Sequence, residues 1–178
     1  LEAHLPRLIA SRKIDFAVAN VENAADGFGV TPELSEGFLA QGLHCLTSGN
    51  HIWDKQEIVD YLGSQPRLLR PENYPANAPG RGVYVGETAS GTKVAVVNLM
   101  GRIFMPPCDD PFRTIDRVLE RLEKTTRVVL VDMHAEATSE KQAMGFHLVG
   151  RASAVFGNAR YDPISLASRL GDPIFSLR

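Results

Sequence analysis

Three polar clusters in this 178-residue sequence combine the side chains that bind metal ions with those that move protons. They lie at residues 20–23 (NVEN), 48–51 (SGNH) and 132–136 (DMHAE). Carboxylate, amide oxygen and imidazole nitrogen together suit divalent cations such as Mn²⁺, Fe²⁺ or Zn²⁺. Two such ions about 3.5–4 Å apart clamp a phosphate and activate water, and an imidazole that binds no metal can protonate the leaving alcohol. The clusters therefore predict metal-assisted hydrolysis.

Each cluster directly follows a short apolar segment that is expected to be a β-strand. These strands are expected at residues 15–20, 44–47 and 128–131. In open α/β sheets, ligands bind at the carboxyl ends of the strands. If the three strands share one sheet, the side chains of Glu22, Asn50 and His134 meet near a common point.

Each of these residues also has a purely structural interpretation. An Asn at a strand end, such as Asn23 or Asn50, often caps the next helix. Glu22 alone is more often a solvated turn residue, and His134 alone is equally a satisfied structural histidine. Only the joint placement of three clusters at one sheet edge favours the functional interpretation.

Helical and strand patterns alternate along the chain, which is typical of one α/β domain. Thr31 is a good N-cap and Pro32 a good first helical residue, so a helix is expected to begin there. Ser139 and Gln142 form a capping-box pattern, which predicts a helix from residue 139 to about 149. Further helices are expected at residues 2–12, 54–62 and 112–124, and further strands at 83–87, 93–99 and 152–156. The strands at 83–87 and 93–99 predict a hairpin added to a mainly parallel sheet.

The composition is that of an ordinary globular protein and disfavours several other classes. The net charge is −2, so no extended nucleic-acid-binding surface is expected. No apolar stretch approaches the roughly 20 residues of a membrane helix. Cys45 and Cys108 show no CxxC spacing, so no disulfide framework is expected and a cytoplasmic location fits best. The oligomeric state, including a homo-oligomer, is left open.

Six segments of the sequence resemble the YmdB-like phosphodiesterases, a branch of the calcineurin-like metallophosphoesterase superfamily. They are NVENAADGFG at 20–29, GNHIWD at 49–54, RLLRP at 67–71, VNLMGR at 97–102, PFRT at 111–114 and HAEATSEK at 134–141. The resemblance runs from about residue 3 to Gly157. It implies a calcineurin-like α/β sandwich, two divalent metal ions (Fe or Mn), and hydrolysis of phosphodiesters such as 2′,3′-cyclic nucleotides.

The resemblance also implies a role for each matching residue. Glu22 would bridge the two metals, and Asn50 and His134 would bind one of them. Asn23 would serve as a metal ligand or a substrate contact, and His51 as the general acid. Asn98 and Arg102 match a further motif but have no assigned role; the motif would shape the rim of the site, or Arg102 would hold phosphate.

Two departures from the family pattern affect these expectations. The family opens with a strand that ends in Gly-Asp, whose aspartate binds the first metal, and it carries Gly-Thr-His-Thr-His after the strand that matches 152–156. This chain starts after the first motif and reads GNARYD at 157–162 in place of the second. The resemblance thus implies an incomplete sandwich, truncated at both ends: a metallophosphoesterase domain at 1–157 lacking the first strand, and a divergent tail at 158–178.

Two functions therefore remain open. One is a two-metal phosphodiesterase that acts on a small phosphodiester, such as a cyclic nucleotide. The alternative is a catalytically impaired fragment of the same fold that serves only as a nucleotide- or partner-binding module. With the late histidine pair replaced, we expect this chain to bind one metal ion or none.

Overall fold

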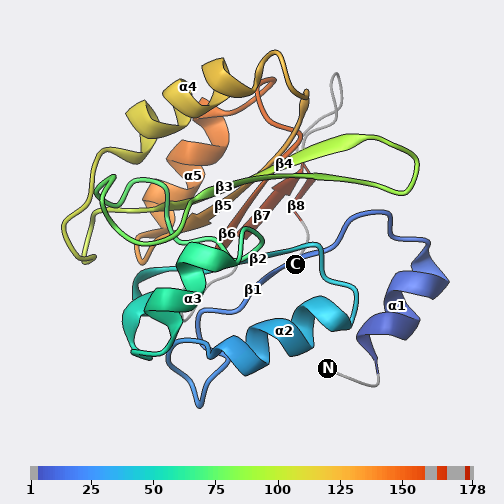
Figure 1. Ribbon diagram of the computed structural model, residues 1–178. Helices are drawn as coiled ribbons and strands as arrows, with labels where there is room; N and C mark the ends of the chain where they lie inside the picture. The colour runs from blue at the N-terminus through green and yellow to red at the C-terminus, as the bar shows by residue number, and fades with distance from the viewer. Residues whose placement is uncertain (1–3, 159–163, 168–174, 177–178) are drawn as a thin grey trace.

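Helices and strands alternate along the chain in the computed structural model, which describes residues 4–158 and the backbone of 164–167 and 175–176 (Figure 1). In chain order the elements are α1 (Leu5–Arg12), β1 (Val18–Asn20), α2 (Pro32–Ala40), β2 (Cys45–Thr47), the 3₁₀ helix η1 (Asn50–Trp53), α3 (Ile58–Ser64), β3 (Val83–Glu87), β4 (Lys93–Met100), α4 (Pro111–Leu122), β5 (Val128–His134), α5 (Thr138–His147), β6 (Ala154–Asn158), β7 (Ile164–Ala167) and β8 (Phe175–Ser176).

The strands form two separate sheets. β1 and β2 pair in parallel as a two-stranded sheet, and the other strands form a six-stranded sheet in the order β3-β4-β5-β6-β7-β8. Within the larger sheet β4, β5 and β6 are parallel, and β3, β7 and β8 run antiparallel to their neighbours. The expectation that the strands at 15–20, 44–47 and 128–131 share one sheet is therefore wrong, because β5 lies in the larger sheet.

The segment after α3 explains why β2 does not join the larger sheet. Leu46 donates its N–H to the carbonyl of Arg67 (2.7 Å), and Leu69 donates to the carbonyl of Leu46 (2.8 Å). Because this segment occupies the free edge of β2, the two sheets stack face to face. The buried side chains of Cys45, Leu69 and Val96 pack between them. The result is the calcineurin-like α/β sandwich expected from the resemblance, with its strands divided differently.

Alternation along the strands decides which side chains lie between the sheets. Odd-numbered residues of β4 and β5, such as Val97 and Val131, belong to the core on the outer, helix-covered face. On the opposite face, apolar Val96 and Leu130 are followed toward the carboxyl ends by polar Asn98, Asp132 and His134. Met100, the last residue of β4, is again apolar. The larger sheet therefore directs polar groups into the layer between the sheets near the carboxyl ends of β4 and β5.

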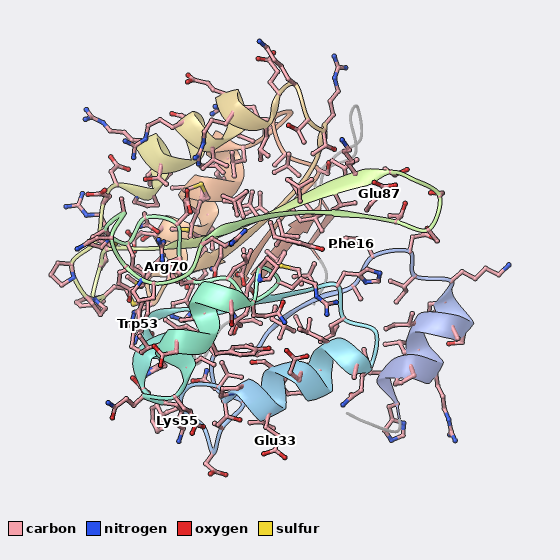
Figure 2. The ribbon with its side chains drawn as sticks, in the orientation of Figure 1. Phe16, Glu33, Trp53, Lys55, Arg70 and Glu87 are labelled. Carbon is pink, nitrogen blue, oxygen red and sulfur yellow. The ribbon has the colours of Figure 1, made fainter. Side chains whose placement is uncertain are left out.

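Helices cover the outer face of each sheet (Figure 1). α4 and α5 pack on the six-stranded sheet, and α2 and α3 lie on the side of the two-stranded sheet. In the layer between the sheets, Phe16 stacks on His44 with ring centroids 4.7 Å apart. Trp53, at the end of η1, lies to the left of Phe16 in Figure 2.

Most local predictions are confirmed, but the start of α3 and the end of β5 differ from those expected. Thr31 caps α2 by accepting from the N–H of Leu34 (3.2 Å), and the hairpin forms from β3 and β4. α3 starts at Ile58, four residues later than expected, because the 3₁₀ helix η1 and a turn precede it. β5 continues to His134, three residues past its expected end, because β4 and β6 pair with it over that length.

The capping box expected at residues 139–142 is wrong. α5 begins at Thr138 after Ala137, which makes no side-chain cap hydrogen bond, so Ser139 lies inside the helix. Glu140, in the first turn of α5, instead accepts from the backbone N–H groups of Arg102 (2.9 Å) and Ile103 (3.1 Å). The first turn of α5 therefore fixes the loop that follows β4.

The expected boundary between a domain at 1–157 and a tail at 158–178 stays a prediction. β6 extends to Asn158, and the backbone of β7 continues the sheet beside it. Residues 159–163, 168–174 and 177–178 lie outside the described residues. In the described parts of the chain, no helix has the length and apolar character needed to span a membrane.

Candidate functional site

Glu22, Asn50 and His134 converge at the carboxyl ends of β1, β2 and β5. Oε2 of Glu22 lies 3.0 Å from Nδ1 of His134, and Oδ1 of Asn50 lies 2.9 Å from Nε2 of the same imidazole. The side chains of Glu22 and His134 are 2% and 3% exposed. The tertiary structure thus brings a carboxylate, an amide and an imidazole together, although the strands that carry them belong to two sheets.

A glycine makes this close approach possible. At Gly49, directly before Asn50, an added Cβ would overlap the imidazole of His134 and the carboxylate of Glu22. A side chain at this position would therefore push apart two of the three converging groups. The glycine in the SGNH segment is required by the packing of the site.

The predicted general acid, His51, lies at the partly exposed rim of this cluster. Its backbone N–H donates to Oε1 of Glu22 (3.0 Å), so the same carboxylate contacts both His134 and the segment that carries His51. Its Nδ1 lies 2.7 Å from Oδ2 of Asp54, and its ring contacts Phe28 edge to face at a centroid distance of 5.0 Å. Asp54 and Phe28 thus fix the orientation of the His51 imidazole.

Asn23 is placed differently from the other predicted site residues. It is exposed in the turn that follows Glu22. Among the described residues, no hydrogen bond joins its side chain to Glu22, Asn50 or His134. Its assignment as a metal ligand or a substrate contact stays a prediction.

Asn98 holds the segment that precedes Asn50 in place. Its Oδ1 accepts from the N–H of Ser48 (2.9 Å), and its Nδ2 donates to the carbonyl of Ser48 (3.1 Å). Ser48 in turn donates its hydroxyl to the carbonyl of Leu69 (2.6 Å). Asn98 is fully buried, so its amide depends on these protein hydrogen bonds. The sequence pointed to the motif of Asn98 but not to this clamp between the two sheets.

A second buried group, Asp132, connects four strands beneath the cluster. Its carboxylate accepts from the hydroxyl of Thr47, from Nδ2 of Asn158 and from Nδ2 of Asn20, the last at 3.1 Å. Burial raises the pKa of Asp132 to about 7, although the hydrogen bonds from Thr47 and Asn20 act in the opposite direction. The sequence pattern of β5 could have indicated this role. Side chains alternate between the two faces of a strand, so residues 132 and 134 lie on the same face when the strand extends to His134.

The converging side chains carry donor types that suit a divalent cation. Glu22 and Asn50 each lie within hydrogen-bonding distance of His134, and a carboxylate, an amide oxygen and an imidazole suit a first-row ion. Among the described residues, no group of three or more His, Cys, Asp or Glu side chains could hold a metal ion, so a three-donor site here must include the amide of Asn50. The two metals of the resemblance stay a prediction.

Comparisons with known proteins show which family this chain belongs to. The chain is 44% identical over 158 residues to the 2′,3′-cyclic-nucleotide 2′-phosphodiesterase of Bacillus subtilis (strain 168), covering 88% of this chain and 59% of that protein. A hypothetical protein from Thermus thermophilus has a similar crystal structure, with a TM-score of 0.80 and 43% identity over 88% of this chain and 60% of that one.

A third comparison and the family match agree with these two. The crystal structure of a novel phosphatase from Mycoplasma pneumoniae also gives a TM-score of 0.80, with 26% identity over 90% of this chain and 58% of that one. The chain therefore spans about three fifths of the length of these relatives. The sequence model of the YmdB-like protein family matches residues 1–160. By this match and by the identity to the Bacillus protein, the chain belongs to the YmdB-like family.

Proposed function

We propose that this chain forms the metal-binding part of a phosphodiesterase that hydrolyses small phosphodiesters such as 2′,3′-cyclic nucleotides. The observation that carries the proposal is the buried contact of His134 with both Glu22 (3.0 Å) and Asn50 (2.9 Å). Buried polar groups that converge in this way are costly unless they hold one another or a ligand. The cyclic-nucleotide substrate class is supported by the name of the Bacillus subtilis relative.

Glu22, Asn50 and His134 are the residues that would hold a divalent cation such as Mn²⁺ or Fe²⁺. When bound, the ion would act as a Lewis acid that polarises a phosphoryl oxygen. The two-metal arrangement of the resemblance belongs to this proposal, and Glu22 is the residue that would contact both ions.

His51 would supply the proton that the reaction needs. Hydrolysis of a cyclic phosphodiester adds water at phosphorus, breaks one P–O bond and requires a proton on the leaving ribose oxygen. Because Oδ2 of Asp54 lies 2.7 Å from Nδ1 of His51 and fixes the ring, Nε2 is the nitrogen left to donate the proton. The backbone bond from His51 to Glu22 keeps this acid beside the metal-binding donors.

A second candidate is a module that binds a nucleotide without hydrolysing it. The observation that favours it is that, among the described residues, no group of three or more His, Cys, Asp or Glu side chains could hold a metal ion. One ion can polarise a phosphate, but the clamp on attacking and leaving oxygens needs two. This alternative predicts binding that depends on metal, with no turnover.

One experiment separates the two candidates. The metal-free 178-residue chain is supplied with Mn²⁺, and hydrolysis of 2′,3′-cyclic AMP and bound manganese are both measured. The phosphodiesterase proposal expects hydrolysis that requires Mn²⁺, is far slower than that of the Bacillus subtilis relative, and is abolished by Glu22→Gln. Nucleotide binding that requires Mn²⁺ without hydrolysis supports the binding module. Hydrolysis that persists in Glu22→Gln contradicts the assignment of this site.

A further inference from the structure

Asn158, the last residue of β6, contacts the imidazole of His134 from the neighbouring strand. The two residues are register partners in the parallel pairing of β5 and β6. Oδ1 of Asn158 lies 2.5 Å from Nδ1 of His134. Asn158 follows Gly157 in the segment where this chain departs from the family pattern, so the resemblance assigned it no role.

The orientation of the Asn158 amide is fixed by its other contact. Nδ2 of Asn158 donates to Oδ1 of Asp132, and the other oxygen of that carboxylate accepts from Thr47 and Asn20. The amide of Asn20 is fixed in the same way, because its Oδ1 accepts from the N–H of Glu22 (3.1 Å). With its NH₂ group directed to Asp132, Asn158 must present its carbonyl oxygen to His134.

This arrangement determines which nitrogen of His134 carries the proton. An amide oxygen can only accept, so Nδ1 of His134 must be the donor. Oε2 of Glu22, 3.0 Å from the same nitrogen, can also only accept when ionised. Oδ1 of Asn50, 2.9 Å from Nε2, is also an acceptor. Among the described residues no second hydrogen bond fixes that amide, so in the neutral imidazole it can turn its NH₂ group toward the lone pair of Nε2. A histidine binds a metal through such an unprotonated nitrogen.

We infer that Asn158 is a positioning residue, which Asp132 orients and which holds His134 in the Nδ1–H tautomer so that Nε2 and Asn50 face the same cation. The metal part of this inference rests on the proposed function, whereas the tautomer is a property of the metal-free chain. Asn158 acts on the cation through His134 and does not itself bind it. Metal ligands are commonly oriented by such partners, whose removal weakens metal binding by about 10–100-fold.

The direct test is the tautomer of His134 in the metal-free 178-residue chain. Two-bond ¹H–¹⁵N NMR at pH 8 distinguishes the protonated from the unprotonated ring nitrogen, and His134→Gln identifies the signals that belong to His134. We expect the Nδ1–H form to dominate in the wild type. We expect Asn158→Leu, which removes the acceptor at similar volume and excludes water, to give a mixture of tautomers. A dominant Nε2–H form in the wild type overturns the inference, even if the variant does not fold.

Mn²⁺ affinity, followed by the EPR signal of the free ion, gives a second readout. Asn158→Leu should bind Mn²⁺ about 10–100-fold more weakly than the wild type. The matched control is Ser153→Ala, which removes another side-chain hydrogen bond between β5 and β6, at the far end of the strands. It should keep the wild-type affinity. Equal weakening by both variants, or none in a folded Asn158→Leu chain, contradicts the inference.

The proposed function and this inference can fail separately. A wild-type chain that neither binds Mn²⁺ nor hydrolyses a cyclic nucleotide would refute the proposed function. The tautomer of His134 would still be measured in that chain and would still support or contradict the role of Asn158.

Discussion

Nε2 of His134 lies 2.9 Å from Oδ1 of Asn50, although 84 residues separate them and His134 ends a strand of one sheet whereas Asn50 follows a strand of the other. The contact exists because the sheets stack face to face and two buried groups tie their carboxyl ends together. Asn98 binds the backbone of Ser48, and Asp132 binds Thr47. The geometry of the metal donors is thus a property of the interface between the sheets, and the following predictions test it.

Replacing His134 by Ala should weaken Mn²⁺ binding by more than about 100-fold, since a direct ligand matters more than the partners that orient it. The measurement is a titration of metal-free protein followed by EPR. His147→Ala is the control, because this imidazole on α5 binds Asp116, away from the site. Equal affinities of the wild type and His134→Ala would contradict the assignment of His134 as a ligand.

Replacing Asp54 by Asn should lower kcat about tenfold and leave KM nearly unchanged. Asp54 lies 2.7 Å from Nδ1 of His51, and a neutral amide should hold this ring less firmly in the orientation that proton transfer requires. His51→Ala should cost about 10²–10⁴-fold, the usual contribution of a general acid. Both values come from steady-state hydrolysis of 2′,3′-cyclic AMP with saturating Mn²⁺.

The control for Asp54 is Asp60→Asn, which changes an exposed carboxylate on α3 and should leave both kinetic constants unchanged. If Asp54→Asn raises KM and leaves kcat as it was, Asp54 contributes to substrate binding and does not assist proton transfer.

Replacing Asn98 by Leu should destabilise the fold by about 2–4 kcal/mol. The substitution leaves the N–H and carbonyl of Ser48 buried without their partner, and each unsatisfied group costs about 1–3 kcal/mol. Urea unfolding measures the change, and the exposed Asn77→Leu is the control. A loss below about 0.5 kcal/mol would show that the clamp does not hold the sheets together.

Cys108 should react slowly with iodoacetamide at neutral pH. Burial raises the pKa of its thiol from 9.0 to about 11, so at pH 8 its thiolate fraction is about 100-fold lower than in the unfolded chain. The rate of alkylation should rise about tenfold per pH unit from pH 8 to 10, because the thiolate is the reactive form.

Peptide mapping by mass spectrometry separates this reaction from that of Cys45, which is fully buried and should react only after unfolding. The same chain in urea is the reference for the unperturbed thiol. Alkylation of Cys108 at the same rate in the folded and unfolded chain at pH 8 would contradict the raised pKa.

The sequence by itself determined the elements of the fold and the residue types of the site. The alternation of helix and strand patterns, the cap at Thr31 and the hairpin of β3 and β4 follow from local rules, and the structure confirms them. Glu22, Asn50 and His134 were identifiable because each follows or ends an apolar strand, and the carboxyl ends of strands are where ligands bind.

Only the tertiary structure decided how the strands are divided and which groups support the site. β2 could pair with β5 in one sheet or stack on it in a second sheet. The segment at 67–69, which occupies the edge of β2, decides between these arrangements, and no local sequence pattern specifies this choice. The contacts of Asn98, Asp132 and Asn158 likewise join residues 24 to 112 positions apart. A hydrogen bond across such a separation depends on packing of the whole chain, whereas caps and turns depend on neighbours in sequence.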